Sequence, residues 1–226
     1  MDQAAKAAGK ELVETAQAVL RSGAISMSGH GNISIRVPGR DELIFTGGSS
    51  LRQIDENQLV RLSLDGRLLE GELPPIAAAV VHMHTAIYQD RSDTRCVIHT
   101  HSPYATAFAV ANRPLEGWSE AFGIFGLKDG VPVAAYGPRG SEQAIANIRA
   151  VMTPKTTAVL LANHGVLAWA PDSQRAVQLG VIIEETAQSA ILAGPIGGAK
   201  IVPADMLHAS IERHAHFESA GALKTG

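Results

Sequence analysis

Two histidines stand one residue apart in the stretch CVIHTHSPYA, which runs from Cys96 to Ala105. The apolar residues before them predict a strand, and on a strand residues i and i+2 project to the same side. His99 and His101 would then lie together and could chelate one metal ion through their imidazole nitrogens. The alternative is that both rings are hydrogen-bonded to backbone in a wet groove.

A third histidine favours the metal interpretation. In LLANHGVLAW an apolar strand is interrupted by Asn163, His164 and Gly165. Histidine is seldom fully buried without a partner, and a glycine after it lets the backbone turn sharply so that the ring can point into a cavity. Two strands that deliver His-x-His and His would form a three-imidazole site with open positions, which is the arrangement of a catalytic metal.

The other histidines are weaker candidates for ligands. His82 and His84 share the one-residue spacing, but VVHMHTAIY predicts a helix, on which this spacing separates two side chains by about 200°. These two histidines therefore cannot both face one metal. His208, His214 and His216 lie in a polar C-terminal segment, which favours solvated surface positions.

Two glycine-containing stretches, SGHGNISIR and IFTGGSS, could bind an anion. Glycines expose backbone N–H groups, and Asn, Thr and Ser side chains add donors, so two such loops side by side can hold a negative group. The candidate substrate-binding residues are Asn32, Thr46, Gly47 and Ser49. The alternative is that both stretches are ordinary hairpin turns.

Helices and hairpins must position these residues. The pattern predicts a helix over 4–22, hairpins over 33–46 and 59–71, a helix over 76–91, a strand over 94–101, a helix over 103–111, an irregular Gly-rich segment over 115–140, a helix over 141–152, a strand pair over 156–170 and a helix over 173–194. Because these elements do not follow a strict βαβ alternation, we expect an α/β fold with a largely antiparallel sheet and helices packed on it. We expect one domain, 1–226.

The composition limits which binding partners and which cellular location we expect. The formal net charge is -3 without a Lys/Arg block, which disfavours nucleic acid and anionic membranes as partners. The sequence contains neither the apolar core of a secretory signal nor the roughly 20 apolar residues of a membrane span. Its single cysteine, Cys96, lies in an apolar run and cannot form an internal disulfide. We therefore expect a cytoplasmic protein that acts on a small molecule.

Taken in order along the chain, these motifs resemble the class II aldolase/adducin family. The stretches that carry the resemblance are GNIS, FTGGSS, HTAIYQDRSDTRCVIHTHSPYATAFAVANRP, LLANHGVLAWA and ETAQSAILA. The resemblance implies a three-layer α/β/α fold with a mostly antiparallel central sheet, and a homotetramer with its site near a subunit interface. It also implies a divalent metal ion (Zn, Mn, Fe or Co) whose three ligands correspond to His99, His101 and His164.

The sequence departs from the sugar-phosphate aldolases of this family at one motif. There, P-S-S-E precedes the H-x-A-I-Y helix, its serines hold the substrate phosphate, and its glutamate serves as acid/base and sometimes as a fourth ligand. Counting back from His84, these positions hold Ala77, Ala78, Ala79 and Val80. Alanines cannot donate hydrogen bonds to a phosphate, and an aliphatic side chain cannot move a proton. The departure predicts a non-phosphorylated substrate that is flatter or more apolar.

Two residues are candidates for proton transfer. The tyrosine that the family offers from a neighbouring subunit falls at Glu120 by ungapped counting from His101. Trp118 and Phe122 beside it could stack on an aromatic substrate or pack in the core. His82 is the other candidate, and its alternative is to pack on the flank of its helix.

The predicted chemistry is that of a metal-dependent carbon–carbon lyase. A three-histidine metal with open positions is a Lewis acid that can stabilise an enolate as a carbon–carbon bond breaks. We prefer decarboxylation of a hydroxylated aromatic carboxylic acid, because the phosphate serines and the glutamate are absent. The alternatives are retro-aldol cleavage of a hydroxy-ketone or hydroxy-acid, a non-heme iron oxygenase, and a non-catalytic adducin-like interaction module.

Overall fold

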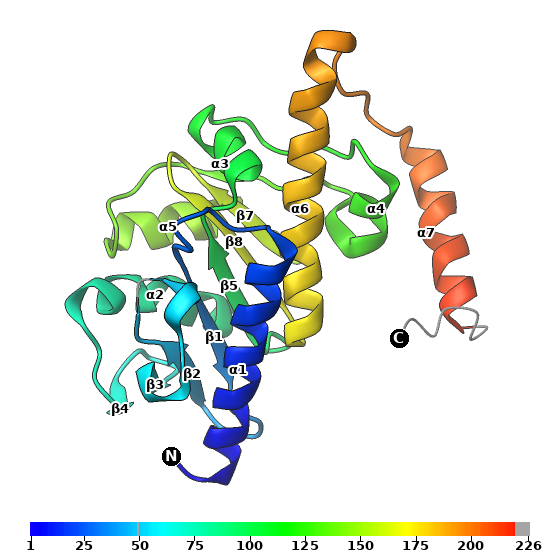
Figure 1. The fold of residues 1–226 in the computed structure, drawn as a ribbon. Helices are drawn as coiled ribbons and strands as arrows, with labels where there is room; N and C mark the ends of the chain where they lie inside the picture. Colours follow the sequence, from blue (N-terminus) through cyan, green and yellow to red (C-terminus); the bar gives the residue numbers. More distant parts are fainter. Residues whose placement is uncertain (49, 220–226) are drawn as a thin grey trace.

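Alternating apolar residues build one continuous sheet (Figure 1). The computed structural model describes residues 1–48 and 50–219, and in this part of the chain eight strands run in the order β4-β3-β2-β1-β5-β8-β7-β6. Their bounds are β1 Gly31–Arg36, β2 Glu42–Thr46, β3 Leu59–Ser63, β4 Leu68–Glu70, β5 Cys96–Thr100, β6 Val133–Ala134, β7 Ala158–Leu161 and β8 Gly165–Ala170. Neighbouring strands are antiparallel except β6 and β7, which are parallel, so the predicted sheet is confirmed.

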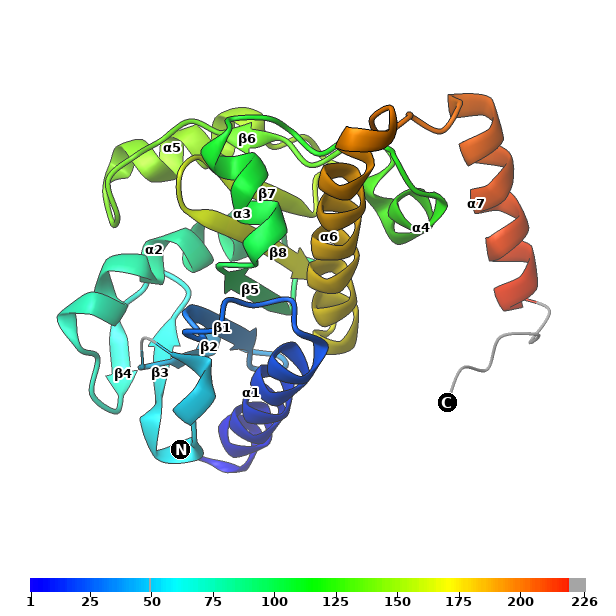
Figure 2. The ribbon, with the colours of Figure 1, turned by 45° about the horizontal axis from the view of Figure 1, so that its top comes forward.

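Helices cover both faces of the sheet, which gives three layers (Figures 1 and 2). One face carries α1 (Gln3–Ser22), α3 (Pro103–Val110) and α6 (Ser173–Ala193), and the other carries α2 (Pro75–Asp90) and α5 (Glu142–Val151). The α/β/α expectation is confirmed. None of the helices in the described ranges is long and apolar enough to cross a membrane.

The two faces of each strand belong to two separate cores. In β5, Ile98 packs in the core under α1 and α6, whereas Val97 packs in the core under α2. The same alternation continues in the polar residues, because side chains two apart share a face of the sheet. His99 therefore lies on the α2 side with Val97, and its backbone partner across β1 and β5 is Asn32.

Capping residues fix where the helices begin and end. Ser141 accepts a hydrogen bond from the Ala144 N–H at the start of α5, as expected of an N-cap. α1 ends at Gly23, whose φ of 77° is a left-handed conformation that glycine adopts without strain. α6 reaches Ala193, and a short turn, η4 (Gly194–Ile196), follows directly.

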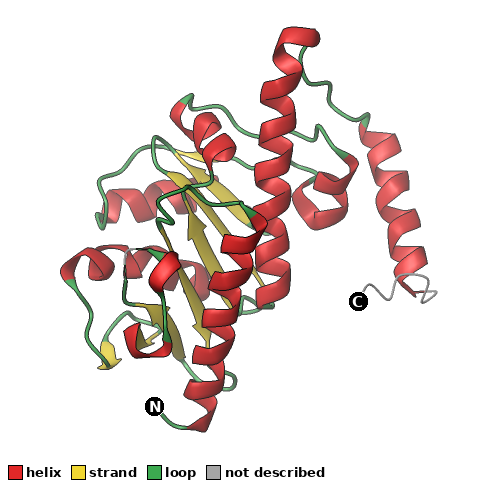
Figure 3. Cartoon of the chain, in the orientation of Figure 1, coloured by secondary structure: helices red, strands yellow, loops and turns green. Residues whose placement is uncertain are grey.

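The segment after α3 is irregular, as predicted (Figure 3). It contains the short α4 (Glu120–Phe122), a π-helical turn η3 (Gly123–Leu127) and the two-residue β6; the remaining short turns are η1 (Leu51–Gln53) and η2 (Glu56–Gln58). The C-terminal histidines lie on one more helix, α7 (Ala204–Ser219), which stands beside α4 at the edge of the molecule (Figure 2). Leu207 of α7 packs on Gly123, where a Cβ would lie 2.4 Å from the leucine Cδ1.

Candidate metal centre and substrate cavity

Three histidine rings meet at one edge of the sheet. His99 is on β5, His101 follows the end of that strand, and His164 is in the turn between β7 and β8. The ring centroids are 5.0 Å apart for His99 and His101, 4.7 Å for His99 and His164, and 4.9 Å for His101 and His164. One ring nitrogen from each residue lies within 4.8 Å of the other two, so the group can hold a metal ion.

The hydrogen bonds around His99 determine which of its nitrogens is free. Its Nδ1 lies 2.8 Å from the carbonyl oxygen of Val166, which can only accept, so Nδ1 carries the proton. The His99 Nε2 therefore presents a lone pair, 3.1 Å from Nε2 of His101. Within the described residues the buried Nε2 of His164 has no hydrogen-bond partner. A divalent cation would satisfy these lone pairs, so the residues present fit the implied metal.

The pKa values of all three histidines favour the neutral form. Burial, with smaller contributions from the neighbouring His164, His30 and Arg139, lowers the pKa of His101 to about 4. Burial likewise lowers the pKa of His164, with a smaller contribution from Arg139, and holds the pKa of His99 well below its ordinary value. Neutral imidazole is the form that coordinates metal, so the trio is ready to bind an ion at neutral pH.

The turn that presents His164 uses two special positions. Asn163, rather than the predicted glycine, takes the left-handed backbone conformation, with φ of 58°. Gly165 is required for a different reason. A Cβ there would lie 2.5 Å from the Thr100 carbonyl oxygen, 3.2 Å from the His101 ring and 3.3 Å from the His99 ring. The glycine therefore allows β8 to approach β5 closely enough for the three rings to meet.

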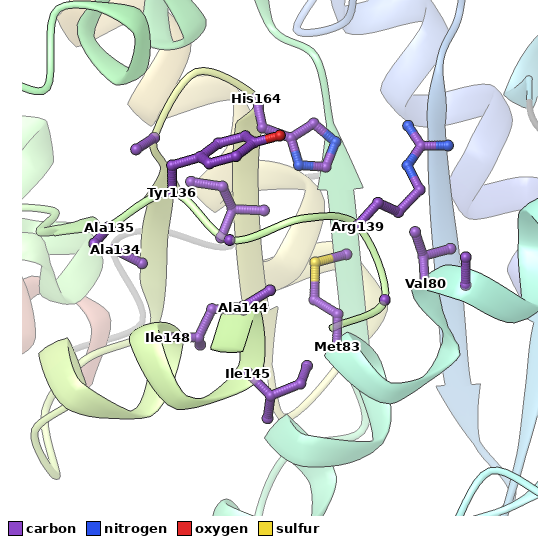
Figure 4. A pocket seen from close by; sticks show the side chains of 15 residues that line it. Val80, Met83, Ala134, Ala135, Tyr136, Arg139, Ala144, Ile145, Ile148 and His164 are labelled. Atoms are coloured by element: carbon purple, nitrogen blue, oxygen red, sulfur yellow. The ribbon is translucent and has the colours of Figure 1, made fainter. Parts of the chain in front are cut away.

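A cavity of about 200 Å³ opens in front of His99 and His101. Its lining residues in the described part of the chain are His30, Gly31, Asn32, Phe45, Gly48, Ile76, Ala77, Val80, His99, His101 and Arg139. A smaller apolar recess of about 40 Å³ lies beside His164 and shares Val80 and Arg139 with the cavity (Figure 4). The site therefore offers a larger cavity with both polar and apolar walls, and a smaller recess that is mainly apolar.

A buried chain of hydrogen bonds orients Asn32. The Asn32 Oδ1 lies 2.6 Å from Nε2 of His84, and the Nδ1 of His84 lies 2.7 Å from the hydroxyl of Ser34. Tyr88 supports Ser34 from behind, with 2.9 Å between the two hydroxyl oxygens. Burial lowers the pKa of His84 to about 3, so its ring is neutral and donates only through Nε2. Because the Asn32 oxygen is occupied in this way, its amide nitrogen remains available to the cavity.

The other predicted anion-binding residues lie deeper. Thr46 is fully buried, and its Oγ1 accepts a hydrogen bond from the Ile33 N–H. The Gly47 N–H donates to the Gln58 carbonyl oxygen at 2.8 Å. Neither residue lines the cavity, although Gly48 does. Ser49 lies outside the described residues.

The two predicted proton-transfer residues do not meet the histidine trio within this chain. His82 is exposed on α2 and lines a surface groove with Arg149 of α5. Glu120 is exposed at the start of α4 and accepts a hydrogen bond from Ser210 of α7. Beside it, Trp118 packs against Phe108 and Phe122 is fully buried.

Two cavity residues are absent from the sequence-based predictions. The His30 ring centroid lies 6.0 Å from that of His101. Arg139, in the loop before α5, lines the cavity with His99 and His101 and the recess with His164 (Figure 4). Both residues are flanked by glycine, in SGHGNIS and in YGPRG. A polar residue beside glycine in a loop was the available signal, and it is weak because most such residues are solvated.

Known proteins resemble this chain over most of its length. A family model described as Class II Aldolase and Adducin N-terminal domain matches residues 10–191. The chain is 32% identical over 200 residues to a 5-deoxy-D-ribulose 1-phosphate aldolase of Bacillus thuringiensis serovar kurstaki, covering 87% of this chain and 90% of that protein. It is 28% identical over 202 residues to a 5-methylthioribulose-1-phosphate/5-deoxyribulose-1-phosphate aldolase of Rhodospirillum rubrum, covering 89% and 88%.

The fold is also that of a solved aldolase. An L-fuculose 1-phosphate aldolase superposes with a TM-score of 0.81 at 27% identity, covering 92% of this chain and 95% of that one. The segment that the family model matches contains all three histidines of the cluster.

Proposed function

Because the chain belongs to the class II aldolase and adducin family, we propose that it is a divalent-metal-dependent carbon–carbon lyase that acts on a non-phosphorylated small molecule. The observation that carries this proposal is the convergence of three neutral imidazoles, with no competing hydrogen bond to the described residues at the Nε2 of His164. His99, His101 and His164 would hold Zn²⁺, Mn²⁺, Fe²⁺ or Co²⁺. Such an ion supplies a Lewis acid that draws electrons toward a substrate oxygen.

The reaction that we favour is decarboxylation of a hydroxylated, aromatic carboxylic acid. The bond to the carboxylate breaks, CO₂ leaves, and the electron pair remains as an enolate that then takes up a proton. Within the described residues, neither Asp nor Glu lines the cavity, and Ala77 and Val80 stand in its wall. Decarboxylation suits such a cavity because it needs no base to deprotonate an alcohol, whereas retro-aldol cleavage does.

The chain's own groups have distinct tasks in this reaction. The Asn32 amide nitrogen would donate to a substrate oxygen, because the buried His84 holds the Asn32 oxygen in the opposite direction. His30 is exposed and lines the cavity, and it is a further candidate to donate the proton that the product carbon receives. Glu120 and His82 remain our proposals for proton transfer, and both would have to act from a neighbouring chain.

Retro-aldol cleavage is the second candidate. It is supported by the names of the relatives, which are aldolases of deoxyribulose, methylthioribulose and fuculose phosphates. The small apolar recess beside His164 could accept a terminal methyl group. We also propose that the chain is a single domain, that it forms a homotetramer with the cavity near a subunit interface, and that it is cytoplasmic.

The test begins with elemental analysis of protein purified without oxygen. The protein is then incubated with hydroxylated aromatic dicarboxylates and with hydroxy-ketones while CO₂, aldehyde and O₂ are recorded. One metal per chain with CO₂ release is the expected result, and aldehyde release would support the aldolase instead. A His101→Ala variant provides the background for each substrate. Absence of metal and of turnover would contradict both enzyme assignments.

A further inference from the structure

Arg139 is a cation without a protein partner at the entrance to the site. Among the described residues it makes no hydrogen bond, ion pair or stacking contact, and its side chain is exposed. It nevertheless forms part of the wall of both the cavity and the recess. Figure 4 shows the Arg139 side chain on the same side of the recess as His164 and Val80. An arginine in this position is available to a ligand, because it has no internal bond to give up.

The loop that carries Arg139 is held close to the two helices beside it. A Cβ at Gly137 would lie 2.5 Å from the Ala144 Cα, so the loop lies directly on α5. Gly140 has φ of 76°, and a Cβ there would lie 2.7 Å from the Ala79 carbonyl oxygen of α2. Glycine at both positions allows this close approach, because a Cβ at either one would overlap the backbone of the helix beside it. The backbone on both sides of Arg139 is therefore held against α5 and α2.

Arg139 is the charged residue that lines both the cavity and the recess in the described part of the chain. Its proximity contributes to the lowered pKa values of His101 and His164. Neither the cavity nor the recess is lined by Asp or Glu in the described part of the chain. A divalent cation on the three histidines would add two further positive charges. A site with this balance attracts an anion and strengthens its binding where water is excluded.

From this arrangement we infer that Arg139 binds a carboxylate of the substrate. The inference rests on the proposed function, because it assumes that the three histidines hold a metal ion. A guanidinium satisfies a carboxylate with two parallel hydrogen bonds, so one arginine is sufficient. A phosphate dianion is usually held by several donors, and the Gly47 N–H that could add one is already bonded to Gln58. The side chains of Ile76, Ala77 and Val80 in the neighbouring wall carry no hydrogen-bond donor.

This carboxylate is the one that the substrate keeps. An ion pair with arginine stabilises the ground state of a carboxylate, and this stabilisation is lost if the group departs as neutral CO₂. The leaving carboxylate must therefore lie elsewhere, against the apolar wall of Val80. The substrate class is consequently a dicarboxylate that also has a hydroxyl or carbonyl oxygen for the metal.

Three ligands that share an α-hydroxy-acid group test the inference by calorimetry on the metal-loaded protein. They are malate, α-hydroxybutyrate and glycerate phosphorylated on its terminal hydroxyl, which end in a carboxylate, a methyl group and a phosphate. We expect the wild type to prefer malate over α-hydroxybutyrate by on the order of 10- to 100-fold, the range of a charge-assisted hydrogen bond. Arg139→Met should abolish this preference, and Arg139→Lys should keep part of it.

Metal content and melting temperature are measured for every variant. Arg113→Met, at an exposed arginine in a different groove, is the matched control and should keep the malate preference. An Arg139→Met protein that retains its metal and loses only the preference would support the inference. An unchanged preference would overturn it, and so would tighter binding of the phosphorylated glycerate that depends on Arg139. Failure of the proposed function would instead appear as missing metal in the wild type.

Discussion

At the scale of single residues, the assignment of the metal depends on three imidazoles acting together. Loss of a residue that only supports a metal ligand typically lowers metal affinity by about 10- to 100-fold. His101→Ala removes a proposed ligand itself, so we expect a larger fall in metal affinity. Activity should be lost with the metal, while the fold remains, because His101 lies at the cavity and not in either core. Metal analysis and circular dichroism measure the two effects.

The matched control is His82→Ala, because His82 is exposed on α2 and lines a different groove. That variant should retain stoichiometric metal. If the His101→Ala protein also retains one metal per chain, the three-histidine assignment is wrong.

His84 gives a prediction of pH dependence. Its folded-state pKa is about 3, because the ring is buried, whereas an unfolded chain has an ordinary histidine pKa near 6.5. Between these values only the unfolded chain binds the proton, so the free energy of unfolding falls as the pH falls, by about 1.4 kcal/mol per pH unit. His84→Gln should be less stable than the wild type at pH 7 because it loses the bond to Ser34.

Denaturant unfolding of both proteins between pH 7 and pH 4 measures this difference. The stability gap should narrow as the pH falls, since the variant has no such proton to bind. A constant gap would mean that His84 is protonated in the folded protein.

The sequence could predict the histidine trio, because strand alternation fixes which side chains share a face. His99 and His101 meet His164 for that reason, and the apolar runs around them make the strands recognisable. Arg139 and His30 could not be found in this way, because loop residues follow no period. Likewise, the sequence around Gly47 predicts a free backbone N–H that could bind an anion. It could not predict that this N–H donates to the Gln58 carbonyl oxygen instead.

At the scale of elements, Glu184 of α6 holds the helix that begins just after the histidine cluster. Its carboxylate accepts the backbone N–H groups of Tyr104 and Ala105 at 2.9 and 2.8 Å, at the N-terminus of α3. α3 starts two residues after His101, so we expect this cap also to position the backbone of the proposed ligand. Glu184→Gln can accept only through one oxygen and should lose about 1 to 2 kcal/mol of stability.

Thermal unfolding and metal titration check the two consequences of that substitution. We expect a lower melting temperature together with weaker metal binding. Glu185→Gln, at the exposed neighbour on the same helix, is the control and should change neither. A loss of stability with unchanged metal affinity would show that the cap does not position His101.

At the scale of the whole molecule, the three layers follow from apolar alternation, but the position of α7 does not. The sequence from Ala204 to Ser219 mixes polar and apolar residues, and its contact with the body includes Leu207 against Gly123. Such a contact joins residues far apart in the chain and has no local signature. Large apolar side chains nearby remain exposed, among them Leu192 at 61%, Ile196 at 87% and Ile201 at 59%. Apolar surface of this kind on one end of a chain often belongs to an interface.

The proposed tetramer makes a prediction about Glu120. Within one chain this residue contacts Ser210 and does not line the cavity, so a role in proton transfer requires a second chain. His101→Ala and Glu120→Gln chains should each be inactive alone. When the two are co-expressed, a site with intact histidines from one chain and an intact Glu120 from its neighbour should form. Random pairing in a symmetric oligomer gives such sites at about a quarter of positions.

Activity per chain of the mixed oligomer, compared with each parent, measures this complementation. Recovery to about a quarter of the wild-type rate would place Glu120 in the neighbouring subunit's site, since neither chain can form that site alone. Full activity of the Glu120→Gln protein on its own would remove Glu120 from the reaction. His82 and His30 would then remain as candidates for the proton donor, and His30 lines the cavity beside the histidine trio in the described part of the chain.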